Sequence, residues 1–341
     1  MPRFEPCRVE MVPVESRALR RNALRDPWRR ALPVVLPPGY DAARHRRYPV
    51  IWVLAGFLGT GRMLLNRSMT VPALDERVAR LVARGSMPPA ILALPDCMTA
   101  LGGSQYLDSP AVGAYETHVC DELVPLVDSH FRTIPRREAR AVAGKSSGGY
   151  GALRLAMRRP DLFAAAASHS GDCYFEYCHV RDFPMAVNAI VEAGGVAKLL
   201  KKVRSTEKPK HEDQIAMMTV ASARCYSPNP RSRDGYDLPF ELPSGRIRED
   251  VVARWLEHDP VRMVERRQHA RALAKLKLLF LDCGTRDQWA LHLGLRVLAE
   301  RLTRLGIRHE HHEFPDDHLS ISYRMDVSLP KLGKALAREA S

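Results

Sequence analysis

The chain has 341 residues, which corresponds to one large α/β domain with an insertion or to two domains. It carries 52 Lys and Arg residues against 39 Asp and Glu residues, a formal net charge of +13. The basic residues are scattered and no aromatic residues interleave them in a stripe, so we interpret them as a solvated surface and expect no nucleic-acid partner. No apolar run approaches the roughly 18 residues that cross a bilayer, so we expect no membrane partner.

The amino terminus and the cysteines bear on location and on metal binding. Residues 1–6 lack the basic and then apolar layout of a secretory signal, which favours a cytoplasmic location. The seven cysteines are odd in number and include no Cys-x-x-Cys pair, so buried or free thiols explain them better than disulfides or zinc. His309, His311 and His312 lie close together without matching carboxylate or cysteine spacing, so we interpret them as surface residues and expect no metal.

Strands and helices are predicted to alternate along most of the chain. Residues 48–55 form a nearly continuous apolar run, which is typical of a central parallel strand. The other predicted strands are residues 9–16, 30–36, 89–94, 139–143, 163–168, 276–281 and 308–313. The predicted helices are residues 74–84, 115–130, 149–157 and 291–305. This alternation predicts an α/β protein with a doubly wound, mostly parallel sheet.

The alternation stops between residues 172 and 270. This stretch holds helical patches at 184–203 and 249–257, separated by the polar, Pro-rich residues 225–244. Because the stretch follows the sixth core strand, we expect it to lie over the carboxyl edge of the sheet and to line a pocket there. The prediction is therefore a single domain, residues 1–341, with a helical, pocket-lining insertion at residues 172–270.

The start of the insertion is rich in aromatic residues. Tyr174, Phe175 and Tyr177 follow shortly after the predicted strand at 163–168. In one interpretation these rings line the substrate pocket, and in the other they attach the insertion to the core. The sequence leaves both interpretations open.

Residues 144–148 read Gly-Lys-Ser-Ser-Gly and lie between the apolar strand at 139–143 and the helix at 149–157. A strand, a Gly-x-Ser-x-Gly turn and a helix together predict a nucleophile elbow, in which Ser146 projects from a tight, strained turn. Glycines are needed on both sides because the strand and the helix pack closely around the turn. The alternative, a phosphate-binding P-loop, requires glycine where the chain has Ala139.

A serine nucleophile needs a base, and the base needs an acid that orients it. In the doubly wound hydrolase arrangement, the chain order is serine, acid and histidine. Asp287 lies in the loop after the strand at 276–281, and His318 follows the last strand, so we expect both at the carboxyl edge of the sheet. We predict that His318 Nε2 takes the proton of Ser146 and that Asp287 holds the Nδ1–H group. Asp282 is the second candidate for the acid.

Two backbone N–H groups are expected to form an oxyanion hole. The first belongs to Ser147, the residue after the nucleophile. The second is expected from the loop after the third strand, residues 55–59, where Gly56 borders the pocket and lets the backbone approach the substrate. Phe57 is the candidate for this second donor. An ordinary turn at the strand end is the alternative for Gly56 and Gly59.

Six segments carry a resemblance to a known family. They are Leu-Pro-Pro-Gly-Tyr at 36–40, Tyr-Pro-Val-Ile-Trp-Val-Leu-Ala-Gly at 48–56, Gly-Ser-Gln-Tyr-Leu-Asp-Ser at 103–109, Glu-Leu-Val-Pro-Leu-Val-Asp at 122–128, Gly-Lys-Ser-Ser-Gly-Gly-Tyr-Gly at 144–151 and Cys-Gly-Thr-Arg-Asp at 283–287. In this order they span nearly the whole chain, which resembles the putative esterase family of α/β-hydrolases. That family includes S-formylglutathione hydrolase (esterase D), enterochelin esterases, feruloyl esterases and mycolyltransferases.

The resemblance implies an α/β-hydrolase fold with the nucleophile at Ser146, the acid at Asp287 and the base at His318. The chain departs from the family pattern at two positions. Ala55 stands where relatives often have His or Ser, and Lys145 stands where they commonly have His. Neither change removes a predicted catalytic group, but we expect Lys145 to border the pocket and to alter how it handles charge.

These residues predict a serine carboxylic-ester hydrolase that forms an acyl-enzyme and needs no cofactor. An acyltransferase, or a thioester hydrolase of the S-formylglutathione type, would use the same chemistry. A non-catalytic binding module is the alternative from another class. The expected partner is a small-molecule ester. Its identity stays open, and so does the choice between a monomer and a homo-oligomer.

Overall fold

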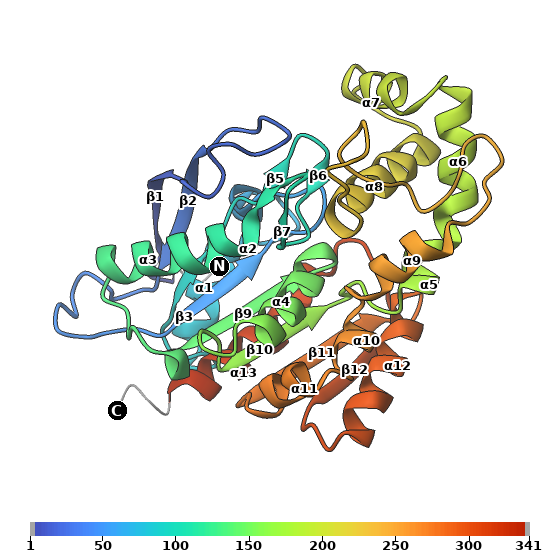
Figure 1. The fold of residues 1–341 in the computed structure, drawn as a ribbon. Coiled ribbons are helices and arrows are strands. Elements are labelled where there is room, and N and C mark those ends of the chain that lie inside the picture. Colours follow the sequence, from blue (N-terminus) through green and yellow to red (C-terminus); the bar gives the residue numbers. More distant parts are fainter. Residues whose placement is uncertain (1–3, 338–341) are drawn as a thin grey trace.

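The computed structural model describes residues 4–337, and its centre is an eight-stranded sheet with the order β1-β2-β4-β3-β9-β10-β11-β12 (Figure 1). The strands are β1 (Arg8–Glu15), β2 (Arg29–Leu36), β3 (Val50–Leu54), β4 (Ile91–Ala93), β9 (Arg140–Lys145), β10 (Ala165–His169), β11 (Leu278–Gly284) and β12 (Glu310–Phe314). Strand β2 runs antiparallel to both of its neighbours, and the other neighbouring pairs are parallel. The predicted α/β class with a mostly parallel sheet is confirmed.

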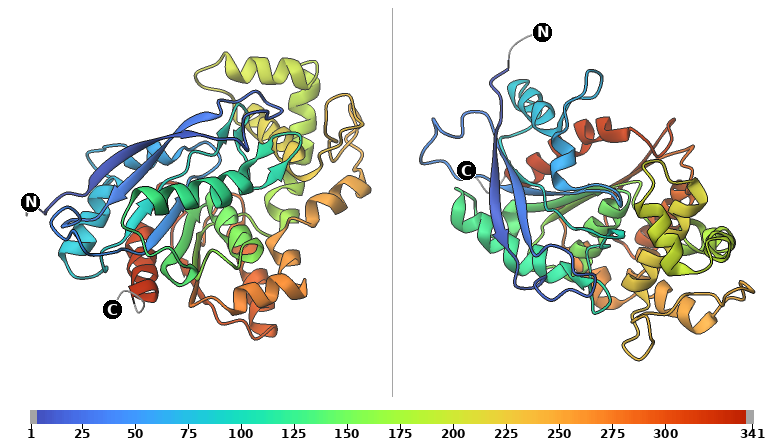
Figure 2. Two further views of the ribbon diagram at one scale, coloured as in Figure 1. Left: turned by 60° about the vertical axis from the view of Figure 1, so that its left-hand side comes forward. Right: turned by 90° about the horizontal axis from the view of Figure 1, so that it is seen from above.

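Helices cover both faces of the sheet, as the two further views also show (Figure 2). One face carries α1 (Leu74–Ala83) and α13 (Met325–Ala337), and the other carries α2 (Tyr115–Thr117), α3 (Val124–His130), α4 (Ser147–Arg158) and α12 (Leu291–Arg304). Strand β3 shows why two layers form. Val50, Trp52 and Leu54 pack into one hydrophobic cluster, whereas Ile51 and Val53 pack into the other. Since side chains alternate along a strand, an all-apolar strand needs cover on both faces.

The structure differs from the predicted elements in a few places. Residues 118–123 form a π-helical turn, which joins α2 to α3 within the predicted helix at 115–130. Helix α13 was not predicted. Two small two-stranded sheets, β5–β6 and β7–β8, were missed as well, because strands of two residues carry no readable period. Their strands are β5 (Met98–Thr99), β6 (Gly102–Gly103), β7 (Asp108–Ser109) and β8 (Gly113–Ala114).

Between β10 and β11 the chain is helical. The helices are α5 (Phe175–Cys178), α6 (Phe183–Glu192), α7 (Val196–Arg204), α8 (His211–Tyr226), α9 (Glu249–Leu256), α10 (Pro260–Met263) and α11 (Arg267–Ala274). Helices α6, α7 and α8 gather in a lobe beside the sheet (Figure 1), while α10 and α11 pack back against α4. The predicted patch at 184–203 is divided by Gly194 and Gly195, which both have positive φ. The extent of a separate insertion stays a prediction.

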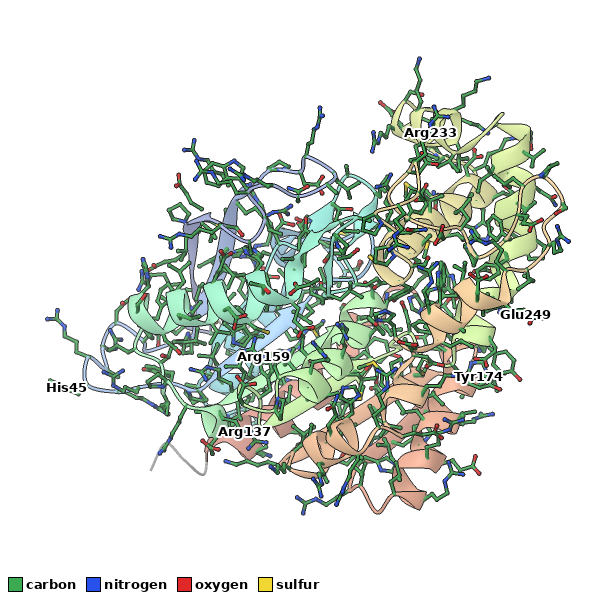
Figure 3. The ribbon with its side chains drawn as sticks, viewed as in Figure 1. His45, Arg137, Arg159, Tyr174, Arg233 and Glu249 are labelled. Atoms are coloured by element: carbon green, nitrogen blue, oxygen red, sulfur yellow. The ribbon has the colours of Figure 1, made fainter. Side chains whose placement is uncertain are left out.

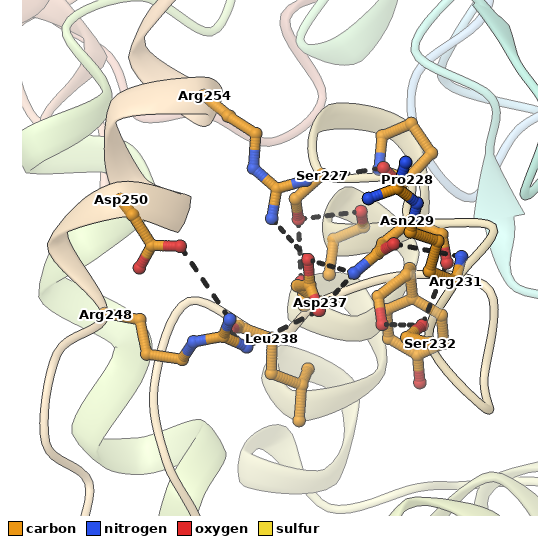
Figure 4. A network of polar contacts seen from close by, with 12 residues as sticks. Ser227, Pro228, Asn229, Arg231, Ser232, Asp237, Leu238, Arg248, Asp250 and Arg254 are labelled. Carbon is orange, nitrogen blue, oxygen red and sulfur yellow. Dashed lines mark hydrogen bonds and ion pairs between the residues drawn. The ribbon is translucent and has the colours of Figure 1, made fainter.

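A polar network orders the Pro-rich loop between α8 and α9 (Figure 4). Asp237 accepts a hydrogen bond from Asn229 Nδ2 at 2.9 Å and forms ion pairs with Arg248 and Arg254. Its backbone carbonyl accepts from Ser227 Oγ at 2.7 Å. Side-chain bonds of this kind add to the isolated backbone bridges of this loop, which join Pro228 to Tyr236 and Phe240 to Ile247.

Basic side chains are spread over separate parts of the molecule. Arg137 and Arg159 lie near the C-terminal end of α4, whereas Arg233 lies in the loop between α8 and α9 (Figure 3). Arg159 is paired with Asp121 at 2.8 Å and with Asp161 at 3.0 Å. In residues 4–337, no single helix has the length and apolar composition of a membrane span, while the bent pair Phe175–Glu192 and Val196–Arg204 meets those two criteria jointly.

Candidate active site

The turn between β9 and α4 has the geometry of an elbow. Ser146 has φ 57° and ψ −127°, a strained conformation for a residue with a side chain. Its N–H group donates to His169 O at 2.9 Å, and its carbonyl accepts from Tyr150 N at 2.9 Å. These two bonds hold the strained residue between the sheet and the first turn of the helix.

The glycines on either side of Ser146 are required by close packing. A Cβ atom on Gly144 would lie 2.3 Å from Gly148 O, and one on Gly148 would lie 2.2 Å from Leu54 O. Both distances are far shorter than a carbon–oxygen contact. The elbow can therefore form against β3 only because positions 144 and 148 have no side chain.

His318 and Asp287 form a buried pair at the carboxyl end of the sheet. Asp287 Oδ2 lies 2.7 Å from His318 Nδ1, and the two residues are 5% and 6% exposed. The other carboxylate oxygen accepts from Trp289 N at 2.9 Å. Burial raises the pKa of Asp287, but the hydrogen bond and charge of His318 and the N–H groups of Trp289 and Leu291 outweigh it and hold this pKa below its usual value.

Asp282, the second candidate acid, lies elsewhere. It is fully buried in β11, where Oδ1 lies 2.6 Å from His169 Nδ1 and Oδ2 accepts from Arg324 Nε at 2.8 Å. His169 Nε2 lies in turn 2.8 Å from Ser328 Oγ. Asp282 therefore belongs to a separate buried network, and Asp287 is the carboxylate that contacts His318.

A cavity of about 450 Å³ brings the predicted residues together. Ser146, His318, Lys145, Gly56 and Phe57 all line it. Within residues 4–337 no hydrogen bond joins the serine to the histidine, and such bonds commonly tighten only when a substrate is bound. The arrangement can deliver a hydroxyl nucleophile and a base into one cavity.

The loop after β3 lies directly against the elbow. A Cβ atom on Gly56 would lie 3.5 Å from Lys145 O and 3.8 Å from Ser146 Cβ. The Phe57 ring packs so closely on β6 that a Cβ atom on Gly102 would lie 2.3 Å from it. This contact holds the backbone of the loop at the cavity.

Lys145 is half-buried in the cavity wall. Burial lowers the pKa of its ammonium group, while the charges of Asp287 and Asp317 oppose this change. The charge of Lys145 is therefore influenced by these two carboxylates, and Lys145 lines the cavity together with His318.

The three aromatic residues at the start of the insertion are not among the residues that line this cavity, which favours the interpretation that they attach the insertion to the core. Phe175 is fully buried, with its ring centroid 6.0 Å from that of Tyr150 and 5.2 Å from that of Tyr226. Tyr174 packs edge to face on Tyr177, which is exposed (Tyr174 is labelled in Figure 3). Helix α5 begins at Phe175 and turns these rings toward the core and the outer surface.

Other residues of the insertion form the wall in their place. Asp172, Cys178 and His179 line the cavity from the same segment, and one face of α8 contributes Gln214, Met218 and Ser222. The three α8 residues are spaced four apart, which is typical of one face of a helix. This spacing was the available sequence signal for them, but no helix was predicted there. Gln105 lines the cavity as well, next to the elbow. In the described part of the chain, no group of three or more His, Cys, Asp or Glu residues is placed to hold a metal ion.

The geometry agrees with what comparison with known proteins finds. The family model described as "Putative esterase" matches residues 25–325. An esterase of Mycobacterium tuberculosis (strain H37Rv) is 26% identical over 324 residues, covering 91% of this chain and 56% of that protein. A protein named endo-1,4-beta-xylanase/feruloyl esterase, from Xylanibacter ruminicola, is 26% identical over 196 residues, covering 52% of this chain and 26% of that protein. The chain thus spans about half of the length of the curated esterases that it matches.

Solved structures show the fold. A ferulic acid esterase has a TM-score of 0.63 and 19% identity, with 98% of this chain and 100% of that chain covered. An S-formylglutathione hydrolase from Agrobacterium tumefaciens has a TM-score of 0.57 and 18% identity, with 98% and 97% covered. The fold is that of the α/β-hydrolases, and the chain belongs to the putative esterase family.

Proposed function

We propose that this protein is a serine carboxylic-ester hydrolase in which Ser146, His318 and Asp287 act as nucleophile, base and orienting acid. The observation that carries the proposal is the 2.7 Å contact between Asp287 Oδ2 and His318 Nδ1 in the wall of a cavity that Ser146 also lines. The membership of an esterase family supports the same reaction class.

The proposed reaction runs in two stages. His318 Nε2 takes the proton of Ser146 Oγ as this oxygen attacks the acyl carbonyl, and the resulting imidazolium then protonates the leaving alcohol. A water molecule, deprotonated by the same histidine, next cleaves the acyl-enzyme and restores the serine. Asp287 stays ionised throughout, because its pKa lies below its usual value, and it stabilises the imidazolium.

The negative charge that develops on the carbonyl oxygen needs hydrogen-bond donors to stabilise it. Ser147 N–H stands at the first turn of α4, where the helix dipole is positive, and Phe57 N–H belongs to the loop against the elbow. We assign these two groups to the oxyanion hole. Apart from the water molecule, the steps use only groups of this chain, and the expected partner is a small-molecule ester.

A serine-reactive organophosphonate tests the nucleophile. It should label Ser146 covalently, and Ser146→Ala should abolish the label and lower turnover on the order of 10⁴-fold or more. Ser170→Ala is a matched control, since this serine also has positive φ near the site but is fully buried, and it should keep the label. Mass spectrometry locates the adduct, and a label on Ser147 or Ser170 would contradict the assignment.

The reaction class is tested with p-nitrophenyl esters of increasing chain length and with an acyl thioester. Release of free acid from the oxygen esters at higher kcat/KM than from the thioester supports an ester hydrolase. Transfer of the acyl group to an added alcohol in place of water would identify an acyltransferase.

A further inference from the structure

Asp172 is the one carboxylate in the described lining of the cavity, and the proposed reaction does not use it. It follows Gly171 in the turn after β10 and is 9% exposed. Among the described residues it forms no ion pair with any Lys, Arg or His side chain. A carboxylate this deeply buried normally has a cation or several hydrogen-bond donors.

Gln105 lines the cavity together with Asp172 and is the one side chain whose hydrogen bonding acts on the pKa of this carboxyl group. Its Oε1 accepts a hydrogen bond from Ser147 Oγ at 2.6 Å, so its NH₂ group is left to face Asp172 and lowers the pKa of that residue. Gln105 is 2% exposed and has φ 53°, a strained conformation held by its surroundings. Its burial and the bond from Ser147 Oγ therefore restrict the rotation of the amide.

The electrostatic setting keeps this acceptor available at neutral pH. Burial raises the pKa of Asp172 to about 6, the charge of His318 lowers it, and the charge of Asp287 raises it. Above that pH the cavity holds an anion with four lone-pair positions, and only the Gln105 side chain and the backbone N–H of Asp172 itself act on it as donors. A substrate group that donates a hydrogen bond would relieve part of the cost of burying this charge.

We propose that Asp172, held by Gln105, is an acceptor site for a hydroxyl group of the ester substrate. The proposal rests on the esterase function above and extends it to a substrate class, namely neutral esters that carry a hydroxyl group near the reacting carbonyl. Met218 and Leu291 line the same cavity and provide apolar surface for the carbon skeleton of the substrate. A neutral donor fits better than an ammonium group, because Lys145 lines the same cavity and His318 becomes positive during the reaction.

Pairs of esters test the proposal when one member carries a hydroxyl group, which can donate a hydrogen bond, and the other carries a methoxy group in its place, which cannot. One pair places the group on the acyl part, p-nitrophenyl β-hydroxybutyrate against β-methoxybutyrate, and one places it on the alcohol part, hydroxyethyl butyrate against methoxyethyl butyrate. The wild-type enzyme should prefer the hydroxyl member of one pair by about tenfold in kcat/KM, which is the value of a hydrogen bond to a charged group. That pair also identifies the side of the ester that meets Asp172.

Variants connect the preference to the residue. Asp172→Asn should reduce the preference several-fold, because a neutral acceptor is weaker, and Asp172→Ala should bring it close to one. Glu176→Gln is a matched control that removes the same charge four residues away, where the side chain pairs with Arg262 outside the cavity lining, and it should keep the full preference.

The outcomes are distinct. An equal loss on both members of each pair would mean that Asp172 acts only through His318, and it would overturn the hydroxyl site. A wild-type enzyme without preference in either pair would overturn it as well, even if the variants fail to fold. Faster cleavage of p-nitrophenyl β-aminobutyrate than of the hydroxy ester would point to a cation site and contradict the proposal. If plain p-nitrophenyl butyrate is not cleaved at all, the proposed function itself has failed.

Discussion

Two histidine–aspartate pairs lie within this fold, and only their surroundings distinguish them. His169 and Asp282 occupy paired positions in β10 and β11, and Arg324 balances the carboxylate. His318 and Asp287 come from loops beyond the strands, and His318 lines a cavity while Asp287 contacts its ring from behind. The same two side chains can thus stabilise a core or serve a reaction, depending on whether a substrate can reach the second ring nitrogen.

Substituting each carboxylate separates these roles. Asp287→Asn should lower turnover on the order of 10⁴-fold with little change in unfolding, because an amide holds the wrong histidine tautomer. Asp282→Asn should leave turnover per folded molecule nearly unchanged but destabilise the protein by roughly 3 kcal/mol, because the largely buried Arg324 loses its partner. Steady-state kinetics and denaturant unfolding measure the two effects. If Asp282→Asn lowered turnover and Asp287→Asn mainly destabilised the protein, Asp287 would be excluded as the acid.

At the scale of elements, α5 and α8 both attach the helical segment between β10 and β11 to the core and both contribute to the cavity wall, through different residues. Helix α5 places Phe175 in a cluster of rings that includes Tyr150 of α4, so it attaches the segment to the core. Helix α8 turns Met218 and Ser222 toward the cavity. Attachment and pocket formation are therefore carried by different residues of these helices, since Cys178 of α5 also lines the cavity and Tyr226 of α8 also packs in the cluster of rings.

Truncation at one position on each helix tests this division. Phe175→Ala should cost about 3–5 kcal/mol and lower kcat/KM for all esters alike, because it leaves a cavity in the core. Met218→Ala should change the ranking of acyl chain lengths, with a loss of stability of about 1 kcal/mol, since this side chain is only partly buried. Melting curves and a p-nitrophenyl ester series provide the comparison. If Phe175→Ala changed the ranking of acyl chain lengths and kept the melting temperature, Phe175 would not be acting as a core residue.

At the scale of the whole molecule, buried histidines couple stability to pH. His258 lies after α9, with its ring centroid 5.2 Å from that of Tyr226, and its carbonyl accepts from Tyr150 Oη at 3.2 Å. Burial, followed by the charges of Arg154, Arg266 and Arg158, lowers the pKa of His258 to about 3. The contact region between α4, α8 and α9 thus contains a histidine that stays neutral.

The sign of the effect follows from proton uptake. Below an ordinary pKa of 6.5 the unfolded chain binds a proton at His258, but the folded protein does not, so this residue destabilises the fold as the pH falls and has no effect above 6.5. His258→Gln should therefore gain stability relative to the wild type by roughly 1 kcal/mol per pH unit below 6.5. Urea unfolding of both proteins at about pH 7 and about pH 5 measures the difference. A difference that is independent of pH would show that His258 is protonated in the folded state.

Local features could be predicted from the sequence. The elbow is determined by a strand, a turn and a helix that are adjacent in the chain, so Gly144, Ser146 and Gly148 were identifiable without tertiary contacts. The alternation of strands and helices likewise specifies the parallel sheet, because each apolar strand needs helical cover on both faces. The chain order of serine, acid and histidine narrowed the acid to two candidates.

Tertiary structure decided the rest. Strand β11 continues to Gly284, past the predicted end at residue 281, so Asp282 stays inside the sheet and Asp287 is the residue that reaches His318. The cavity wall depends on how α8 is placed over the elbow, which no local pattern specifies. Gln105 lies in the segment 103–109 that carries part of the family resemblance, but it is far in the sequence from Asp172, and no sequence pattern connected the two residues. They become a candidate site only because the fold buries a carboxylate beside an amide of restricted rotation, where hydrogen bonding is left incomplete.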